Sequence, residues 1–142
     1  MAKIPQVKHV MTPFPHSIGE DESIGAAIEM MDTHDIRHLP VTRGHDIVGI
    51  ISDTDLQVAR ALWGERPEDA TTRIGLICTR MPYTVDLSEP LDRVVLEMAE
   101  RQVGSVVVLK EERLAGILTT TDVCRLLAEY LHPTPPEDDE VA

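Results

Sequence analysis

Two short segments of the sequence place a carboxylate among hydroxyl groups at the end of an apolar run. The first covers residues 49–55, and the second follows 67 positions later at residues 116–122. Each begins with Gly-Ile and ends with Ser or Thr, any residue, Thr, and Asp. The apolar run is typical of a buried strand, and the amphipathic segment that follows is typical of a helix. The sequence therefore predicts two similar strand-to-helix corners.

These residue types at such a corner are suited to holding a sugar and its phosphate. The first N–H groups of a helix have no partner within the helix, so they attract anions. An ionised carboxylate only accepts hydrogen bonds, and it can take both hydroxyls of a cis-diol at once. Each Asp is also a typical helix cap, and capping and sugar binding are compatible roles.

The two corners belong to a longer internal duplication. Shifting the sequence by 67 positions aligns residues 10–56 with residues 77–123 without a gap. Turn residues match, as in Pro15 with Pro82, and apolar positions correspond, as in Ile28 with Val95. A gapless register with identities at turns indicates a repeated structural unit.

Each copy has the pattern of a short strand, a helix, two strands and a second helix. In the first copy we expect the short strand at residues 17–18, the first helix from about Glu20, the two strands at 37–42 and 46–52, and the second helix at 54–62. In the second copy we expect the short strand at residues 83–85, the first helix after a cap at Ser88, the two strands at 104–109 and 114–118, and the second helix at 121–131. One copy alone is too small to bury a sufficient core. We therefore predict an α/β (α+β) fold in which two pseudo-symmetric β-α-β-β-α repeats pack sheet against sheet.

The remaining segments complete the predicted organisation of the chain. The order is a lead-in strand at residues 1–9, a first repeat at 10–62, a connection at 63–76, a second repeat at 77–131 and a tail at 132–142. The tail is rich in proline and acidic residues, so it is expected to be disordered.

Composition excludes several classes of function. The net charge of −12 and the aromatic content of 3% oppose a nucleic-acid-binding surface, which needs clustered basic residues or stacking platforms. We expect no membrane span and no signal peptide, because no apolar run has the required length or layout. The two cysteines, Cys78 and Cys124, fit reduced thiols in a cytoplasmic protein.

Three short motifs together resemble a known family. They are the lead-in Val-Met-Thr-Pro at residues 10–13, Ile-Arg-His-Leu-Pro-Val at residues 36–41, and the two corners. In this order they resemble a tandem cystathionine β-synthase (CBS) domain pair, or Bateman module, of the stand-alone bacterial type. The resemblance covers about residues 4–131. The second copy departs from it, because Gly-Ser-Val-Val-Val at residues 104–108 lacks the Arg-His pair and the proline.

The resemblance implies two clefts between the repeats that bind an adenine nucleotide (AMP, ADP or ATP) or S-adenosylmethionine. In such clefts the motif Asp accepts hydrogen bonds from the ribose, and the Ser or Thr residues face the phosphate. One cleft would use Ser52, Thr54 and Asp55, with Tyr83 leaning over it from the other repeat. The other cleft would use Thr119, Thr121 and Asp122, with His16, Arg37 and His38 reaching it from the first repeat. We favour the second of these clefts, because Arg37 and His38 can complete an anion pocket there.

The implied function is regulatory. We expect a nucleotide-sensing module that forms a homodimer and acts on a separate effector protein, since the 142 residues contain no recognisable effector domain. The alternative is a structural or interaction module with vestigial clefts. An enzyme is not expected, because no nucleophile has a partner base at motif spacing. No metal site and no required cofactor are expected, since the histidines lack ligand spacing.

Overall fold

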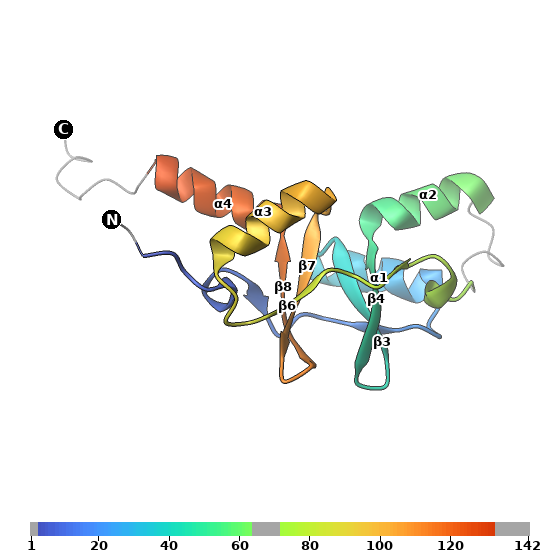
Figure 1. Cartoon of the computed structure of the whole chain (residues 1–142). Helices are drawn as coiled ribbons and strands as arrows, with labels where there is room; N and C mark the ends of the chain where they lie inside the picture. The colour runs from blue at the N-terminus through green and yellow to red at the C-terminus, as the bar shows by residue number, and fades with distance from the viewer. Residues whose placement is uncertain (1–2, 64–71, 133–142) are drawn as a thin grey trace.

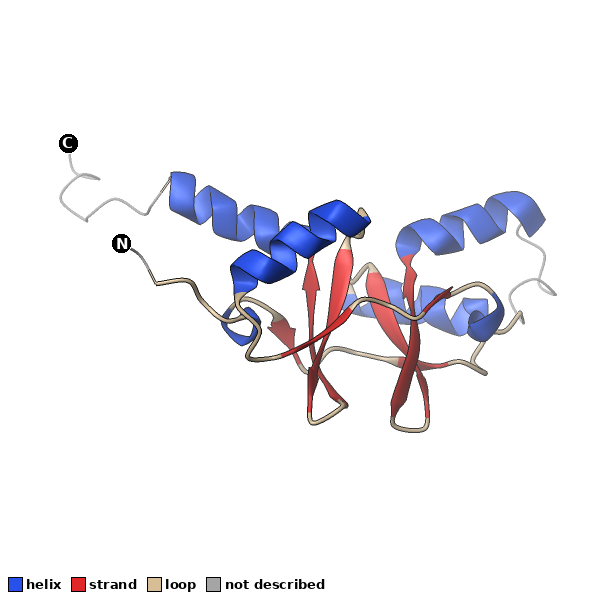
Figure 2. Ribbon diagram, viewed as in Figure 1, coloured by secondary structure: helices blue, strands red, loops and turns tan. Residues whose placement is uncertain are grey.

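Two four-stranded sheets form the centre of the molecule, and each packs with two helices (Figures 1 and 2). This computed structural model describes residues 3–63 and 72–132. The predicted tail, and most of the predicted connection between the repeats, lie outside the described residues. No helix in the described part of the chain is long and apolar enough to span a bilayer.

The elements follow the predicted order in both repeats. The first repeat contains β2 (Ile18–Gly19), α1 (Ile24–His34), β3 (His38–Arg43), β4 (Asp46–Ser52) and α2 (Asp53–Trp63); the second contains β6 (Thr84–Asp86), α3 (Leu91–Arg101), β7 (Ser105–Lys110), β8 (Arg113–Thr119) and α4 (Thr120–Leu131). The predicted β-α-β-β-α unit is therefore confirmed twice. Two further strands, β1 (Thr12–Pro13) and β5 (Thr79–Arg80), precede the repeats.

Two predicted helix starts were wrong. Helix α1 begins at Ile24, because Ser23 caps it by accepting a hydrogen bond from the N–H of Ala26. The Glu20 side chain precedes the helix and pairs with Arg43 instead. Helix α3 begins after Pro90 with no side-chain cap, because the Ser88 hydroxyl bonds to the carboxylate of Asp86 in the preceding turn.

The short leading strands are exchanged between the repeats. One sheet has the order β1-β8-β7-β6 and the other has β2-β3-β4-β5, so each contains a strand that precedes the opposite repeat. Thr12 pairs with Ile117 of β8, and Thr79 pairs with Ile50 of β4. Each sheet is therefore incomplete without the other half of the chain.

The segment before β1 takes part in the same exchange. Residues 7–9 form a 3₁₀ turn, η1 (Val7–His9), where a lead-in strand was predicted. The N–H of Val7 donates to the carbonyl of Glu89 in the second repeat, and the Val7 side chain is fully buried in that repeat's core. The equivalent Ile74 donates to Glu22 and is buried in the core of the first repeat.

The two sheets meet through aliphatic side chains, as the sequence predicted. Ile50 of β4 packs with Val107 of β7 and Ile117 of β8 in a separate core cluster. All three are at least nine-tenths buried. Burial of a branched aliphatic side chain contributes about 1.5–3 kcal/mol relative to its exposure to water. This contact joins the repeats into one unit.

The duplication extends to the backbone conformation. Left-handed residues occur at positions related by the same shift of 67, in the turns after β1 and β5, after α1 and α3, and between the paired strands. The pairs and their φ values are Phe14 and Met81 (49° and 52°), Asp35 and Gln102 (51° and 57°), and Gly44 and Glu111 (62° and 52°). Five of these six residues carry a Cβ, which makes this conformation unfavourable for them. Both repeats thus bend at the same places.

The glycine in each strand is needed for the strand exchange. A Cβ atom at Gly49 would lie 2.7 Å from both the Cys78 Sγ atom and the carbonyl oxygen of Thr79. A Cβ atom at Gly116 would lie 2.3 Å from the Sδ atom of Met11. The exchanged segments therefore lie against β4 and β8 at the glycine of each strand, where no side chain is in the way.

We predict that Gly49→Ala lowers the free energy of unfolding by about 1–3 kcal/mol, because the added methyl group meets backbone that cannot rotate away. Gly116→Ala should cost less, since the flexible Met11 side chain can move. Chemical denaturation followed by circular dichroism measures both. Gly104→Ala is the matched control, because its Cβ would meet only Thr120 Oγ1 at an ordinary 3.5 Å. Equal denaturation midpoints for Gly49→Ala and the control would contradict this account of the strand crossing.

Candidate ligand-binding cleft

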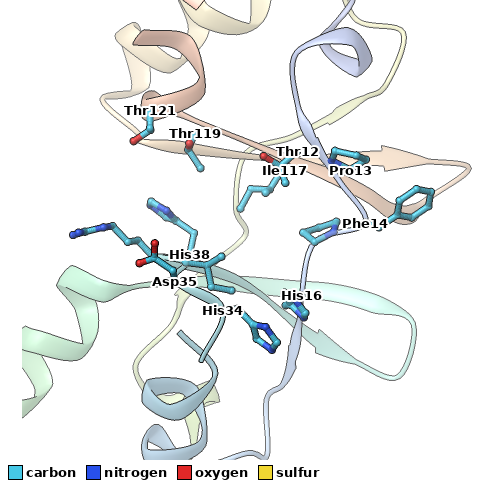
Figure 3. Close-up of a pocket in the computed structure, with 13 residues that line it drawn as sticks. Thr12, Pro13, Phe14, His16, His34, Asp35, His38, Ile117, Thr119 and Thr121 are labelled. Atoms are coloured by element: carbon cyan, nitrogen blue, oxygen red, sulfur yellow. The ribbon is translucent and has the colours of Figure 1, made fainter. Parts of the chain in front are cut away.

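A cleft of about 590 Å³ lies between the two repeats (Figure 3). Its walls come from three places: the segment from β1 to β2, the end of α1 with the start of β3, and the corner between β8 and α4. The lining residues are Thr12, Pro13, Phe14, Pro15, His16, His34, Asp35, Ile36, Arg37, His38, Ile117, Thr119 and Thr121. A volume of this size is typical of small-molecule sites.

The structure gathers five of the ten predicted site residues in this cleft. His16, Arg37 and His38 reach it from the first repeat, and Thr119 and Thr121 reach it from the second. His38 points across the cleft toward the two threonines (Figure 3). Because β3 begins at His38 and α4 begins just after Thr119, both lie where a strand meets an adjoining element.

The two motif carboxylates are helix caps. The Asp122 Oδ2 atom accepts a hydrogen bond from the N–H of Thr119 at 2.9 Å, and the Thr119 hydroxyl accepts one from the N–H of Asp122 at 3.3 Å. Asp55 and Ser52 repeat this arrangement at 2.8 and 3.1 Å. In each case the carboxylate holds the corner in shape, and its Oδ1 atom is not part of the cap. The capping role considered at the sequence level is confirmed for both.

Asp122 lies beside the cleft rather than in its lining. Its side chain is 12% exposed, and its Oδ1 atom is 3.9 Å from Arg125 Nη1. It lines a separate, smaller hollow with His9, Val10 and Arg125. The role of Asp122 in binding a ribose therefore stays a prediction.

Tyr83, which was predicted to lean over the other cleft, contacts an arginine of its own repeat. The ring of Tyr83 lies under the guanidinium of Arg101, whose Cζ atom is 4.4 Å from the ring centroid. Tyr83 lines a hollow formed otherwise by residues 89–101, and Ser52, Thr54 and Asp55 are not among its lining residues. Their role in a second binding site stays a prediction.

Eight of the thirteen lining residues were not predicted, and the titratable ones among them are His34 and Asp35. His34 ends α1, and Asp35 forms the left-handed C-cap of that helix. The imidazole of His34 stacks on that of His16 with ring centroids 3.7 Å apart and an angle of 15° between the planes. Their position in the sequence could have indicated them, since both directly precede the Ile-Arg-His segment that was predicted to reach the cleft. The stacking itself joins residues 18 positions apart and depends on the fold.

His38 is held in its neutral form. Burial lowers the pKa of His38 from its ordinary value of 6.5, and the positive charge of Arg37 lowers it further. The carboxylates of Asp55, Asp122 and Asp53 act in the opposite direction but do not outweigh burial. His38 can therefore donate one hydrogen bond and accept another at neutral pH.

Arg37 is only loosely held. Its side chain is 79% exposed, and its Nη1 atom lies 3.8 Å from the Oδ2 atom of Asp53 at the start of α2. The same Asp53 oxygen accepts a hydrogen bond from Gln57 Nε2 at 2.9 Å. An exposed ion pair at this distance contributes little to stability. Arg37 is thus free to reorient toward a ligand.

No group of three or more His, Cys, Asp or Glu side chains in residues 3–63 and 72–132 could hold a metal ion. Cys78 and Cys124 are both free thiols, and burial raises the pKa of Cys78. The cleft lining offers hydroxyls, imidazoles, one guanidinium, one carboxylate and apolar walls. This set of groups is suited to a polar ligand with an aromatic or apolar part.

A family model, relatives in sequence and solved structures all match this chain to one family. The family model of the CBS domain matches residues 7–61 and again residues 74–129. Hypoxic response protein 1 of Mycobacterium tuberculosis is 34% identical over 114 residues, which are 80% of this chain and 78% of the relative. A CBS domain-containing protein of Dictyostelium discoideum is 30% identical over 140 residues, with 92% of this chain and 97% of the relative covered.

Solved structures of similar fold include two with bound ligands. The CBS domain pair of protein MJ0100, in complex with 5′-methylthioadenosine and S-adenosyl-L-methionine, has a TM-score of 0.80 at 29% identity and covers 90% of this chain and 99% of its own. CBSX2 in complex with AMP has a TM-score of 0.73 at 25% identity and covers 89% and 98%. Hypoxic Response Protein I, with two coordinated zinc ions, has a TM-score of 0.72 at 29% identity and covers 85% and 98%.

We predict that lowering the pH below about 6.5 destabilises the protein partly through His38. The folded-state pKa lies below the ordinary value, so the unfolded chain binds the proton first as the pH falls. The stabilisation is complete above pH 6.5 and is lost as the pH falls from 6.5 through the folded-state pKa. Thermal unfolding of the wild type and His38→Gln between about pH 7.5 and 5 should show a smaller decrease for the variant.

His45→Gln is the control, because His45 is exposed in the β3–β4 turn. Titration of the His38 ring by NMR measures the same quantity directly. A ring pKa at or above 6.5 would contradict the burial argument.

Proposed function

The chain belongs to the CBS domain family, and we propose that it is a regulatory module that binds an adenine nucleotide or S-adenosylmethionine in the cleft between its repeats. In this proposal the ligand controls the activity of a separate partner protein, and the module itself catalyses no reaction. The observation that carries the proposal is the convergence of Arg37 and His38 from one repeat with Thr119 and Thr121 from the other.

The cleft supplies the contacts that an adenosine ligand needs. Pro13, Ile36 and Ile117 provide apolar surface for a purine ring. The hydroxyls of Thr119 and Thr121 lie at the N-terminal end of α4, where helix N–H groups favour an anion. His38 faces them and can complete the contact with a phosphate or a ribose hydroxyl.

The similar structures support the same ligand class. MJ0100 is in complex with two adenosine derivatives and CBSX2 with AMP. The similarity covers 99% of the crystallised domain pair of MJ0100 and 98% of the CBSX2 chain. A zinc-binding role is not proposed, because the described residues contain no cluster that could hold a metal ion.

A ligand in this position would bridge the two repeats. The cleft walls include the β1–β2 segment, which joins the two sheets. They also include the start of α4, a helix of the second repeat that has exposed side chains farther along. Ligand binding would therefore fix the relative position of the repeats. We propose that this change is transmitted through the helices to a partner.

Exposed apolar side chains on α2 and α4 are the proposed contacts of a homodimer. Leu62 on α2 is 72% exposed, and Leu127, Tyr130 and Leu131 on α4 are each more than half exposed. Leu127, Tyr130 and Leu131 share one face of α4 by their helical spacing, and apolar surface of this kind commonly marks an interface. The same observation favours the second candidate function, a structural or interaction module with unused clefts. The capping boxes fit this alternative as well, since they explain both motif carboxylates without a ligand.

We predict that AMP or S-adenosylmethionine raises the melting temperature by several degrees at a concentration about 100 times its dissociation constant, which corresponds to about 2.7 kcal/mol. Asp122→Asn should weaken binding about tenfold, because it removes a charged acceptor while preserving the shape of the cap. Calorimetric titration measures both effects. Asp46→Asn, an equal change in charge on an exposed residue of the β3–β4 hairpin, is the control. The absence of heat with AMP, ATP, 5′-methylthioadenosine and S-adenosylmethionine would leave the structural alternative.

We predict a dimer at micromolar concentration in analytical ultracentrifugation. Leu127→Glu on α4 should shift the equilibrium toward monomer by at least tenfold, because burying an unpaired carboxylate is costly. Leu96→Glu is the control, since Leu96 is similarly exposed but lies on α3. A wild-type monomer, or equal dissociation of both variants, would contradict the proposed interface.

A further inference from the structure

The charge distribution around the cleft is unusual for a site that holds phosphates. Of the thirteen described residues that line it, Arg37 carries the one permanent positive charge and Asp35 the one carboxylate. The other titratable groups in the lining are the imidazoles of His16, His34 and His38. The lining therefore has no net charge when its histidines are neutral.

Three further carboxylates surround the polar end of the cleft. Asp53 lies 3.8 Å from Arg37 and offsets its charge. Asp55 and Asp122 are close enough to His38 to act on its protonation. Together with Asp35 they make four carboxylates, against two guanidiniums: that of Arg37 in the lining and that of Arg125, which lies 3.9 Å from Asp122. The whole chain carries a net charge of −12, so no long-range attraction compensates for them.

We infer that the cleft selects adenosine ligands with at most one phosphate, or with a positive charge as in a sulfonium nucleoside, over ADP and ATP. This inference rests on the proposed function and narrows its ligand class. Each added phosphate brings further negative charge toward the end where the carboxylates gather. Like charges repel one another more strongly in a partly buried site than in bulk water, so the selection is measurable.

Asp53 is the specificity-determining residue in this arrangement. Asp53 is the first residue of α2, and its side chain is partly exposed. Its Oδ2 atom accepts a hydrogen bond from Gln57 Nε2 and is also the atom nearest to Arg37 Nη1. The equivalent residue in the second repeat, shifted by 67 positions, is Thr120, which carries no charge. The first repeat thus places a carboxylate next to the one arginine of the cleft at a position where the fold also accepts a hydroxyl.

The test measures dissociation constants for 5′-methylthioadenosine, S-adenosylmethionine, AMP, ADP and ATP by calorimetry, with EDTA and separately with Mg²⁺. We expect affinity to fall by about fivefold or more with each phosphate after the first. Asp53→Thr, which copies the second repeat, should leave the affinity for 5′-methylthioadenosine unchanged and strengthen ATP binding by about tenfold. Without the Asp53 carboxylate, the positive charge of Arg37 is no longer offset where the phosphates would lie.

Asp46→Asn is the matched control for net charge, because Asp46 is exposed in the β3–β4 hairpin and outside the cleft lining. It should change the affinity for ATP by less than about twofold. An ATP affinity equal to or above that of AMP in the wild type, with or without Mg²⁺, would overturn the inference while leaving the proposed function intact. Equal effects of Asp53→Thr and Asp46→Asn would also overturn it. Failure of all five ligands to bind would instead remove the proposed function.

Discussion

The exchange of β1 and β5 between the two sheets is the constraint on which the rest of the structure depends. Each of these strands is only two residues long and pairs with one central strand of the opposite repeat, β1 with β8 and β5 with β4. The residues around them, such as Val7 and Ile74, are fully buried in the opposite core. Neither repeat can complete its sheet alone, and the contact of Ile50 with Val107 and Ile117 adds to this mutual dependence.

The same exchange produces the cleft. After β1 pairs with β8, the chain must return to the first sheet to form β2, and residues 14–17 span this distance. This return segment forms one wall of the cleft, and His16 reaches His34 from it. The site is thus built where the chain crosses from one repeat to the other. A ligand there would act on the connection that holds the repeats together.

The capping boxes set the geometry of the polar wall. Because Asp122 holds the first turn of α4 through Thr119, the positions of Thr119 and Thr121 are fixed before any ligand binds. On the opposite wall, burial keeps His38 neutral although three carboxylates act on it. Arg37 is largely exposed beside Asp53. A preformed wall that faces an adjustable one is a common arrangement in binding sites and reduces the entropy lost when a ligand is ordered.

The sequence by itself determined the features that depend on local pattern. The shift of 67 positions gave the two repeats, the strand pairs and their helices, and it located the capped corners at Asp55 and Asp122. Tertiary structure alone decided the partners of β1 and β5, because a two-residue strand carries no periodicity and pairs with residues about 30 to 100 positions away. It also decided that His16 stacks on His34, that Tyr83 lies under Arg101, and that Asp122 sits beside the cleft. These outcomes depend on side-chain positions across the two repeats, which sequence spacing does not specify.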